Sequence, residues 1–158
     1  MGIDGRCVSE RMGGNLTIGH PVGHWVAEQV AGGYYEERST AIGLEKGGKI
    51  VAGVIYESWN GVSVVCHIAI SSRITRRFVG VIFDYPFQQL KVQKIIVSVA
   101  SGNLKSTKLV KHMGFTEEGR IANAHPDGDL VIWTMRQADC RFLGDRYGQK
   151  YTHTTASA

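Results

Sequence analysis

Hydrophobic residues in the first half of the chain form short runs that predict three strands. The runs cover residues 41–44, 49–56 and 62–70 and are separated by Lys46-Gly47-Gly48 and Trp59-Asn60-Gly61. Gly-Gly and Asn-Gly tolerate the positive φ that tight turns require. We therefore expect three consecutive strands joined by two hairpin turns.

Two later segments show the spacing of about 3.6 residues that is typical of a helix. The first follows Ile70, has Thr75 as N-cap and should kink or end near Pro86, because proline lacks a backbone N–H and clashes with the preceding turn. The second covers residues 103–113, with Asn103 as N-cap and Gly114 as its stop. A weaker amphipathic pattern predicts a short helix within residues 19–30.

Residues 94–100, 115–121 and 130–136 complete the pattern as strands, the last two on either side of a turn at 125–128. The predicted order is helix, three strands, helix, strand, helix, two strands. This order indicates an α/β fold of the α+β type. We expect residues 1–144 to form a single domain and residues 145–158 to be a polar, flexible tail.

The composition narrows the class of protein. The 158 residues are 43% hydrophobic and 20% charged, which excludes wholesale disorder, and no apolar stretch approaches the roughly 18 to 20 residues of a membrane helix. The first ten residues lack the apolar segment of a secretion signal. The three cysteines form no CxxC pair, and His20 and His24 lack a third metal ligand in sequence. We expect a cytoplasmic protein with no membrane partner and no metal.

Positive charge is concentrated in one part of the chain. Residues 73–120 hold nine Lys or Arg against three acidic residues, a net charge of +6, whereas the remaining residues have a net charge of −2. A localised anionic ligand would account for this distribution. A solvated, lysine-rich helix face is the alternative.

The segment from Asn103 to Gly119 reads Asn-Leu-Lys-Ser-Thr-Lys-Leu-Val-Lys-His-Met-Gly-Phe-Thr-Glu-Glu-Gly. It resembles the Asn-xx-Ser/Ala-xx-Leu/Val-xxxx-Gly-Phe signature of the GCN5-related N-acetyltransferases (GNATs), and most of all their ribosomal-protein alanine acetyltransferase-like branch. Together with residues 83–87 and 121–129 it is similar to acetyltransferases encoded by tailed bacteriophages. The resemblance covers residues 40–140.

The resemblance implies the GNAT fold, which is a mixed, mostly antiparallel central sheet with a splay between its fourth and fifth strands and helices on both faces. It also implies that acetyl-CoA is the co-substrate and that an acetyl group passes to a primary amine by direct attack in a ternary complex. A protein N-terminus, a lysine or a small amine all remain open as acceptor. A homodimer is compatible with the resemblance.

The resemblance places the coenzyme pyrophosphate where a strand turns into a helix, since unpaired N–H groups and the helix dipole favour anions there. The five residues it assigns to this junction are Arg73, Ile74, Thr75, Arg76 and Arg77. The family pattern has glycines here and this chain has none. Either the arginine side chains replace a close approach of the backbone, or coenzyme binding is weak or lost.

The pantetheine arm would pair with the backbone of Ile68, Ala69 and Ile70, whose amides would also polarise the thioester carbonyl. By resemblance, Asn103 and Ser106 contact the coenzyme arm; simple helix capping is the alternative. Many family members have a tyrosine that protonates the leaving thiolate at the position of Val110. Ser106 or solvent would supply that proton here.

A general base has to accept a proton from the amine. His67 is the first candidate and Glu57 the second, because histidine exchanges protons near neutral pH. A structural histidine, with solvent as the base, is the alternative. By resemblance, Trp25, Tyr34 and Tyr35 shape the acceptor pocket, although a solvated helix end would explain them equally well.

A different class of function is a weakly active or inactive GNAT-fold module that binds nucleic acid or a protein through the basic segment. The missing glycines and the missing tyrosine favour this rival. The aromatic residues of the segment have core-like spacing, which does not favour nucleic acid as a partner.

Overall fold

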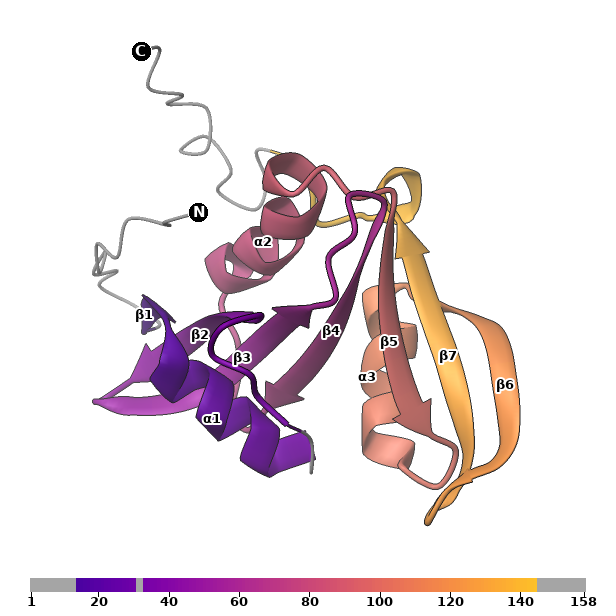
Figure 1. The fold of residues 1–158 in the computed structure, drawn as a ribbon. Coiled ribbons are helices and arrows are strands. Elements are labelled where there is room, and N and C mark those ends of the chain that lie inside the picture. The colour runs from indigo at the N-terminus through magenta and orange to yellow at the C-terminus, as the bar shows by residue number, and fades with distance from the viewer. Residues whose placement is uncertain (1–13, 31–32, 145–158) are drawn as a thin grey trace.

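The computed structural model describes residues 14–30 and 33–144 (Figure 1). None of the helices in these two ranges combines the length and the hydrophobicity that a membrane-spanning helix requires. The expectations for a secretion signal and for the tail concern residues 1–13 and 145–158. They therefore lie outside the described residues, as does Cys7.

A seven-stranded sheet forms the centre of the fold, in the order β1-β2-β3-β4-β5-β7-β6. Strands β4 and β5 are parallel, and all other neighbouring strands are antiparallel. The strands are β1 (Asn15–Ile18), β2 (Thr40–Lys46), β3 (Lys49–Glu57), β4 (Ser63–Ile70), β5 (Lys94–Ala100), β6 (Thr116–His125) and β7 (Gly128–Arg136). The mixed, mostly antiparallel sheet implied by the resemblance is confirmed.

Strand β1 is the element that the sequence pattern missed. It has only four residues, pairs with β2 along the sheet edge and shows no buried position. A strand this short shows no alternation long enough to recognise, and its pairing with β2 supplies the stability that its own sequence lacks.

Of the two predicted hairpin turns, the first forms as a tight turn and the second is replaced by a longer loop. Lys46 pairs with Lys49 across Gly47 and Gly48, both at positive φ, so this tight turn is confirmed. Strands β3 and β4 are also joined as a hairpin, but through the longer loop of residues 58–62 instead of a tight Asn-Gly turn. The side chain of Asn60 accepts hydrogen bonds from the amides of Val62 and Ser63, which closes the longer loop.

Three α-helices form where the pattern predicts them. They are α1 (His20–Val30), α2 (Arg76–Asp84) and α3 (Leu104–Met113). Thr75 and Asn103 cap α2 and α3 through their side chains, and Gly114 ends α3 at a φ of 98°. Pro86 ends the α-helical geometry as expected, and the chain continues as one π-helical turn, Tyr85–Gln89.

Helices cover both faces of the sheet, as the resemblance implies (Figure 1). Helix α1 packs on one face through Val22 and Val26, above Gly43 and Gly53. A β-carbon at Gly53 would lie 2.7 Å from Val26 Cγ2, so the absence of a side chain lets α1 approach the sheet closely.

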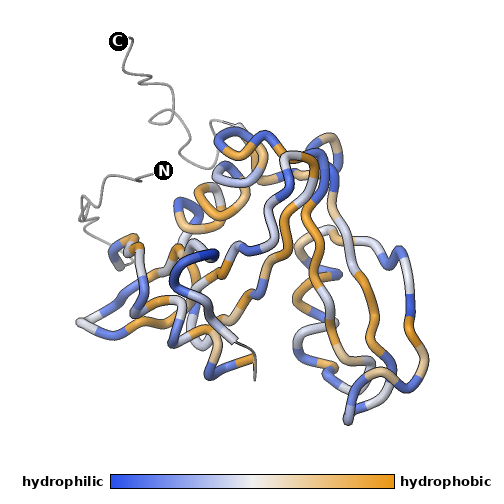
Figure 2. Tube along the Cα trace, in the orientation of Figure 1, coloured by the Kyte–Doolittle hydropathy of each residue, from blue (hydrophilic) through white to orange (hydrophobic). Residues whose placement is uncertain are grey.

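The larger part of the core lies on the opposite face, where α2 and α3 pack. Phe78, Phe83 and Phe87 are almost fully buried there. Figure 2 shows hydrophobic positions recurring along β3, β4, β5 and β7, whereas β6 carries hydrophilic stretches and is mostly exposed. The sheet is therefore buried on both faces at its centre and open at the β6 edge.

Strands β4 and β5 separate along their length. They pair only over residues 63–65 of β4 and 94–96 of β5, after which β4 follows β3 and β5 follows β7. Figure 1 shows the two strands diverging toward their C-terminal ends. The implied splay between the fourth and fifth strands is confirmed, and it leaves facing backbone edges without a strand partner over the rest of β4 and β5.

Candidate active site

A cleft of about 340 Å³ occupies the splay between β4 and β5. Its walls come from both strands, the end of α1, the first turns of α3 and the β6–β7 turn. The lining residues used below are Cys66, His67, Ile68, Asn103, Ser106, Val110, His125 and Asp127. Residues far apart in sequence thus share one cleft because the sheet opens at this point.

His67 and Glu57 form a pair beside this cleft. Nε2 of His67 lies 2.6 Å from Oε1 of Glu57, and the two side chains are 26% and 22% exposed. Glu57 lies opposite Val65 in the β3–β4 ladder, so His67 is its diagonal neighbour on the same face. The pair is mostly enclosed but still accessible, and a carboxylate in this position can orient the ring and stabilise it when it carries a proton.

A second hollow, which we call the outer pocket, has Glu57 of this pair in its wall. It measures about 670 Å³ and is lined by Tyr35, Arg38, Ser39, Glu57, Ser58 and Trp59. Glu57 therefore lines the outer pocket while its hydrogen-bond partner His67 lines the cleft. The two partners of the hydrogen bond therefore line different spaces.

The strand-to-helix junction after β4 has a free donor at the start of α2. Oγ1 of Thr75 accepts from the Phe78 amide at 3.1 Å, and the Thr75 carbonyl accepts from the Val79 amide at 3.1 Å. The Arg76 amide has no hydrogen-bond partner among the described residues. Because Arg73 and Arg76 are exposed beside it, the junction can receive an anion.

The start of α3 forms another wall of the cleft. Oδ1 of Asn103 accepts from the Ser106 amide at 3.1 Å, so the capping role considered for Asn103 is confirmed. Asn103 and Ser106 also line the cleft. Their contact with a coenzyme arm stays a prediction.

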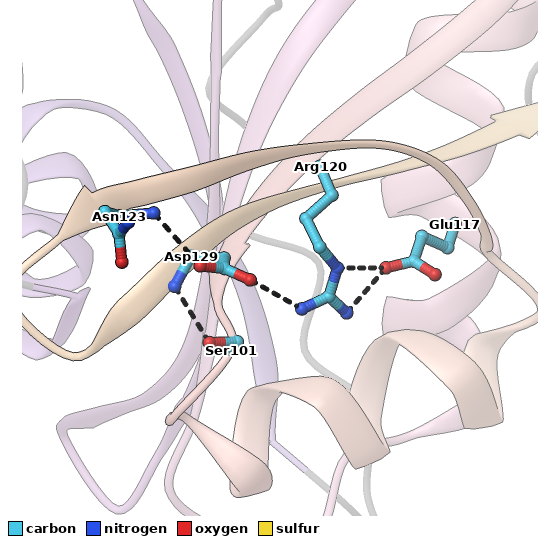
Figure 3. A network of polar contacts seen from close by, with 5 residues as sticks. All are labelled: Ser101, Glu117, Arg120, Asn123 and Asp129. Atoms are coloured by element: carbon cyan, nitrogen blue, oxygen red, sulfur yellow. Dashed lines mark hydrogen bonds and ion pairs between the residues drawn. The ribbon is translucent and has the colours of Figure 1, made fainter.

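The β6–β7 turn is held against the loop that precedes α3 (Figure 3). The carboxylate of Asp129 accepts from the Asn123 amide at 3.0 Å and from Arg120 at 3.1 Å, and the Asp129 amide donates to Oγ of Ser101 at 2.9 Å. The hydrogen bond from the Asn123 amide, followed by that from Arg120, lowers the pKa of Asp129. Arg120 also binds Glu117, which extends the network along β6.

This network positions a wall of the cleft. The Gly102 amide donates to the Asp127 carbonyl at 3.0 Å, and a β-carbon at Gly102 would lie only 2.5 Å from that oxygen. Asp127 and His125 of the same turn line the cleft. The close contact of the turn with the α3 loop therefore fixes the far side of the cleft.

The structure brings four of the predicted site residues together in the cleft, namely His67, Ile68, Asn103 and Ser106. Ala69 faces the α1 side of the sheet, and the side chains of Ile70 and Ile74 pack against the larger core. The side chains of Ala69, Ile70 and Ile74 thus serve packing, which leaves only their backbone for a ligand. Residues 73–77, which the resemblance assigns to pyrophosphate binding, lie outside the cleft, at and before the start of α2, and this role stays a prediction.

The three aromatic residues predicted for the acceptor pocket separate. Tyr35 lines the outer pocket, whereas Trp25 packs half-buried against the cluster under α1. Tyr34 packs its ring over Gly23 and shares a 2.9 Å hydrogen bond with His20. Their roles toward an acceptor are still predictions.

His20 and His24, the two histidines considered as metal ligands, form hydrogen bonds with other side chains. His24 lies 2.8 Å from Glu36, and this hydrogen bond lowers the pKa of Glu36. Over residues 14–30 and 33–144, no group of three His, Cys, Asp or Glu side chains is placed to hold a metal ion.

Several residues that line the outer pocket were not predicted from the sequence as site residues. Trp59 belongs to a segment interpreted only as a turn, and Arg38 and Ser39 lie in a connection with no motif. The sequence signal that could have marked the outer pocket is a tryptophan directly beside the Asn60-Gly61 turn, where a large apolar side chain is rarely part of the core. In the structure Trp59 is indeed 49% exposed.

Cys66 also lines the cleft, next to the candidate base. Burial is the main cause that raises the pKa of its thiol well above the ordinary value, and the charge of Glu57 adds to the rise. Because the thiolate is the nucleophilic form, Cys66 is a poor acceptor for an acyl group.

Comparison with known proteins shows a GNAT-like α/β fold. No family model matches the chain, and no curated protein matches its sequence. Among solved structures, it is similar to spermidine/spermine N-acetyltransferase SpeG from Vibrio cholerae in complex with manganese ions, with a TM-score of 0.63, 18% identity and coverage of 78% of this chain and 92% of that chain. A structure named probable acetyltransferase gives a TM-score of 0.55, 19% identity and coverage of 64% and 62%.

These likenesses confirm the predicted fold class. The nearer resemblances, to ribosomal-protein alanine acetyltransferases and to phage acetyltransferases, stay predictions from the sequence.

Proposed function

We propose that the chain is an N-acetyltransferase that moves the acetyl group of acetyl-CoA to a primary amine. The observation that carries the proposal is the splay cleft, in which the free edge of β4 and a histidine–carboxylate pair lie together. A strand edge without a partner can pair with the amides of a pantetheine arm. The fold supports the same conclusion.

The coenzyme would lie along β4 with its pyrophosphate at the start of α2. The free Arg76 amide, the helix dipole and the exposed guanidinium groups of Arg73 and Arg76 together offer donors to phosphate oxygens. Side chains would thus replace the glycine-rich approach of the family pattern. Arg77, Asn103 and Ser106 complete the predicted coenzyme contacts.

In the reaction, the amine nitrogen attacks the thioester carbonyl, a C–N bond forms, and the C–S bond breaks. His67 accepts the proton that the amine loses, and Glu57 orients the ring and balances its positive charge. The coenzyme A thiolate leaves and takes a proton from solvent or from Ser106. Transfer is direct, because the raised pKa of Cys66 makes an acetyl-cysteine intermediate unfavourable.

The test measures release of free coenzyme A from acetyl-CoA with a panel of primary amines and identifies the acetylated product by mass spectrometry. The panel includes spermidine, since structural neighbours are named spermidine N-acetyltransferases. His67→Gln should reduce turnover by about 10²-fold or more while acetyl-CoA affinity stays nearly unchanged. His112→Gln, at an exposed position near the end of α3, is the matched control and should be neutral.

Two results would argue against the proposal. If acetyl-CoA produces neither binding heat nor a thermal shift, the rival binding module gains support. If His67→Gln keeps most of the activity and the pH profile follows the pKa of the acceptor amine, solvent is the base and His67 is structural.

A further inference from the structure

The outer pocket contains two opposite charges that are not paired with each other. Glu57 binds His67, and Arg38 forms no ion pair with any residue that the structure describes. The Arg38 guanidinium lies 5.5 Å from the centre of the Tyr35 ring, which holds it at the pocket wall. The pocket wall thus carries a positive group without a charged partner and a carboxylate that already binds His67.

A residue of the same pocket carries a buried polar atom without a partner. The Ser39 hydroxyl is enclosed and has no hydrogen-bond partner within residues 14–30 and 33–144, although Ser39 lines the pocket beside Arg38. Buried hydroxyls without a partner are uncommon in proteins, because losing water without compensation is unfavourable. If the Ser39 side chain rotates about χ1 toward the pocket, a ligand group there would supply the missing hydrogen bond.

The remaining walls suit an aliphatic chain. Tyr35 and Trp59 are 58% and 49% exposed, and both line the pocket. Ser58, between Glu57 and Trp59, has a φ of 55°, which non-glycine residues adopt rarely and which directs the chain around the pocket edge. Exposed aromatic faces that meet at a pocket are a typical lining for a small ligand.

We propose that the outer pocket binds an acceptor that carries an anionic group as well as its amine, such as an aminoalkyl carboxylate or an aminoalkyl phosphonate. Arg38 and Ser39 hold the anion, Tyr35 and Trp59 contact the chain, and the amine reaches the Glu57–His67 pair. This substrate class rests on the proposed acetyltransferase function. A linear diamine would place its second cation near Arg38, which opposes binding.

The experiment compares matched acceptors that differ only in the anionic group. The probes are 4-aminobutyrate with butylamine and 6-aminohexanoate with hexylamine, while 3-aminopropylphosphonate separates phosphonate from carboxylate recognition. A charge-assisted hydrogen bond to guanidinium corresponds to a preference of about 10- to 100-fold in kcat/KM. We expect wild-type protein to prefer the anionic member of a pair by this factor.

Arg38→Gln should abolish the preference by lowering kcat/KM for the anionic acceptor, with little effect on the alkylamine. Arg38→Lys should keep part of it, because lysine retains the charge but not the planar fork. Lys49→Gln removes a cation at the exposed β2–β3 turn, outside both pockets, and should leave the preference intact. Equal kcat/KM for both members of each pair, or equal effects of Arg38→Gln and Lys49→Gln, would overturn the inference.

Calorimetry distinguishes failure of this inference from failure of the proposed function. If no amine of either type releases coenzyme A, the transferase proposal fails. Binding of 6-aminohexanoate that disappears in Arg38→Gln would then still support the ligand class. Absence of that binding would overturn the ligand class as well.

Discussion

Helix α1 lies directly over Gly43 of β2 and Gly53 of β3, and Gly53→Ala tests whether this close approach depends on the missing side chain. The new methyl carbon would lie 2.7 Å from Val26 Cγ2 and 2.9 Å from Val22 Cγ1. Carbon atoms pack best at about 3.5 to 4.0 Å, so α1 would have to move by roughly 1 Å. Both valines are buried, with exposures of 1% or less, which leaves little room to rearrange.

The size of the effect follows from two opposing contributions. Overpacking a core site costs about 1 to 3 kcal/mol, whereas replacing glycine by alanine restricts the unfolded chain and stabilises by about 0.4 to 1 kcal/mol. Gly119→Ala in β6 provides the second contribution alone, because its new methyl would meet nothing closer than 4.0 Å. The free energies of unfolding of the two variants should therefore differ by about 1 to 3 kcal/mol.

Urea unfolding of wild type, Gly53→Ala and Gly119→Ala measures this difference, and thermal melting should show about 2 to 4 °C for each kcal/mol. In the double variant Gly53→Ala with Val26→Ala, the added methyl would occupy the space that the shortened side chain leaves. Its loss of stability should thus be smaller than the sum of the two single losses. Equal stability of Gly53→Ala and Gly119→Ala, or strict additivity in the double variant, would refute the close approach of α1.

Three further predictions concern the walls of the cleft. Asn103→Ala should lower the free energy of unfolding by about 0.5 to 2 kcal/mol, because the Ser106 amide loses its acceptor, whereas Asn103→Ser should retain most of the cap; an unchanged urea midpoint in Asn103→Ala would contradict this. Incubation with acetyl-CoA alone should leave Cys66 unmodified in peptide mass spectrometry, because its pKa is raised by burial; an acetyl adduct at Cys66 would refute direct transfer. The lowered pKa of Asp129 stabilises the folded state above the ordinary aspartate range, and this contribution disappears as the pH falls through the lowered value. The Tm difference between wild type and Asp129→Asn should therefore shrink in acid, and a difference independent of pH would contradict the network in Figure 3.

The helices could be predicted because their signals are local. Thr75, Asn103 and Gly114 act within one helical turn of their own position, so sequence spacing alone locates the ends of α2 and α3. The splay could not be found this way. It depends on β4 pairing with β3 while β5 pairs with β7, and only the resemblance implied it.

The sequence signal for the outer pocket was weaker than the signals for the helices. Arg38 and Ser39 precede β2, while Ser58 and Trp59 follow β3, and antiparallel pairing brings these two segments to the same end of the sheet. Thr40 pairs with Tyr56, so the residues just before one strand and just after the other become neighbours. The predicted hairpin already implied that these two segments are neighbours. A turn at Gly47-Gly48 pairs residues near 40 with residues near 56.

The Glu57–His67 pair depends on the exact register of the β3–β4 hairpin. A tight turn at Asn60 and Gly61, as the sequence favours, would pair Trp59 with Val62 and therefore Glu57 with Val64. His67 would then lie on the opposite face of the sheet from Glu57, and the two could not meet. The loop of residues 58–62 moves the register by one residue, so that Glu57 lies opposite Val65 and shares a face with His67. The positive φ of Ser58 and the two hydrogen bonds to the Asn60 side chain accompany this longer loop, so the turn chemistry determines whether a histidine–carboxylate pair exists beside the cleft.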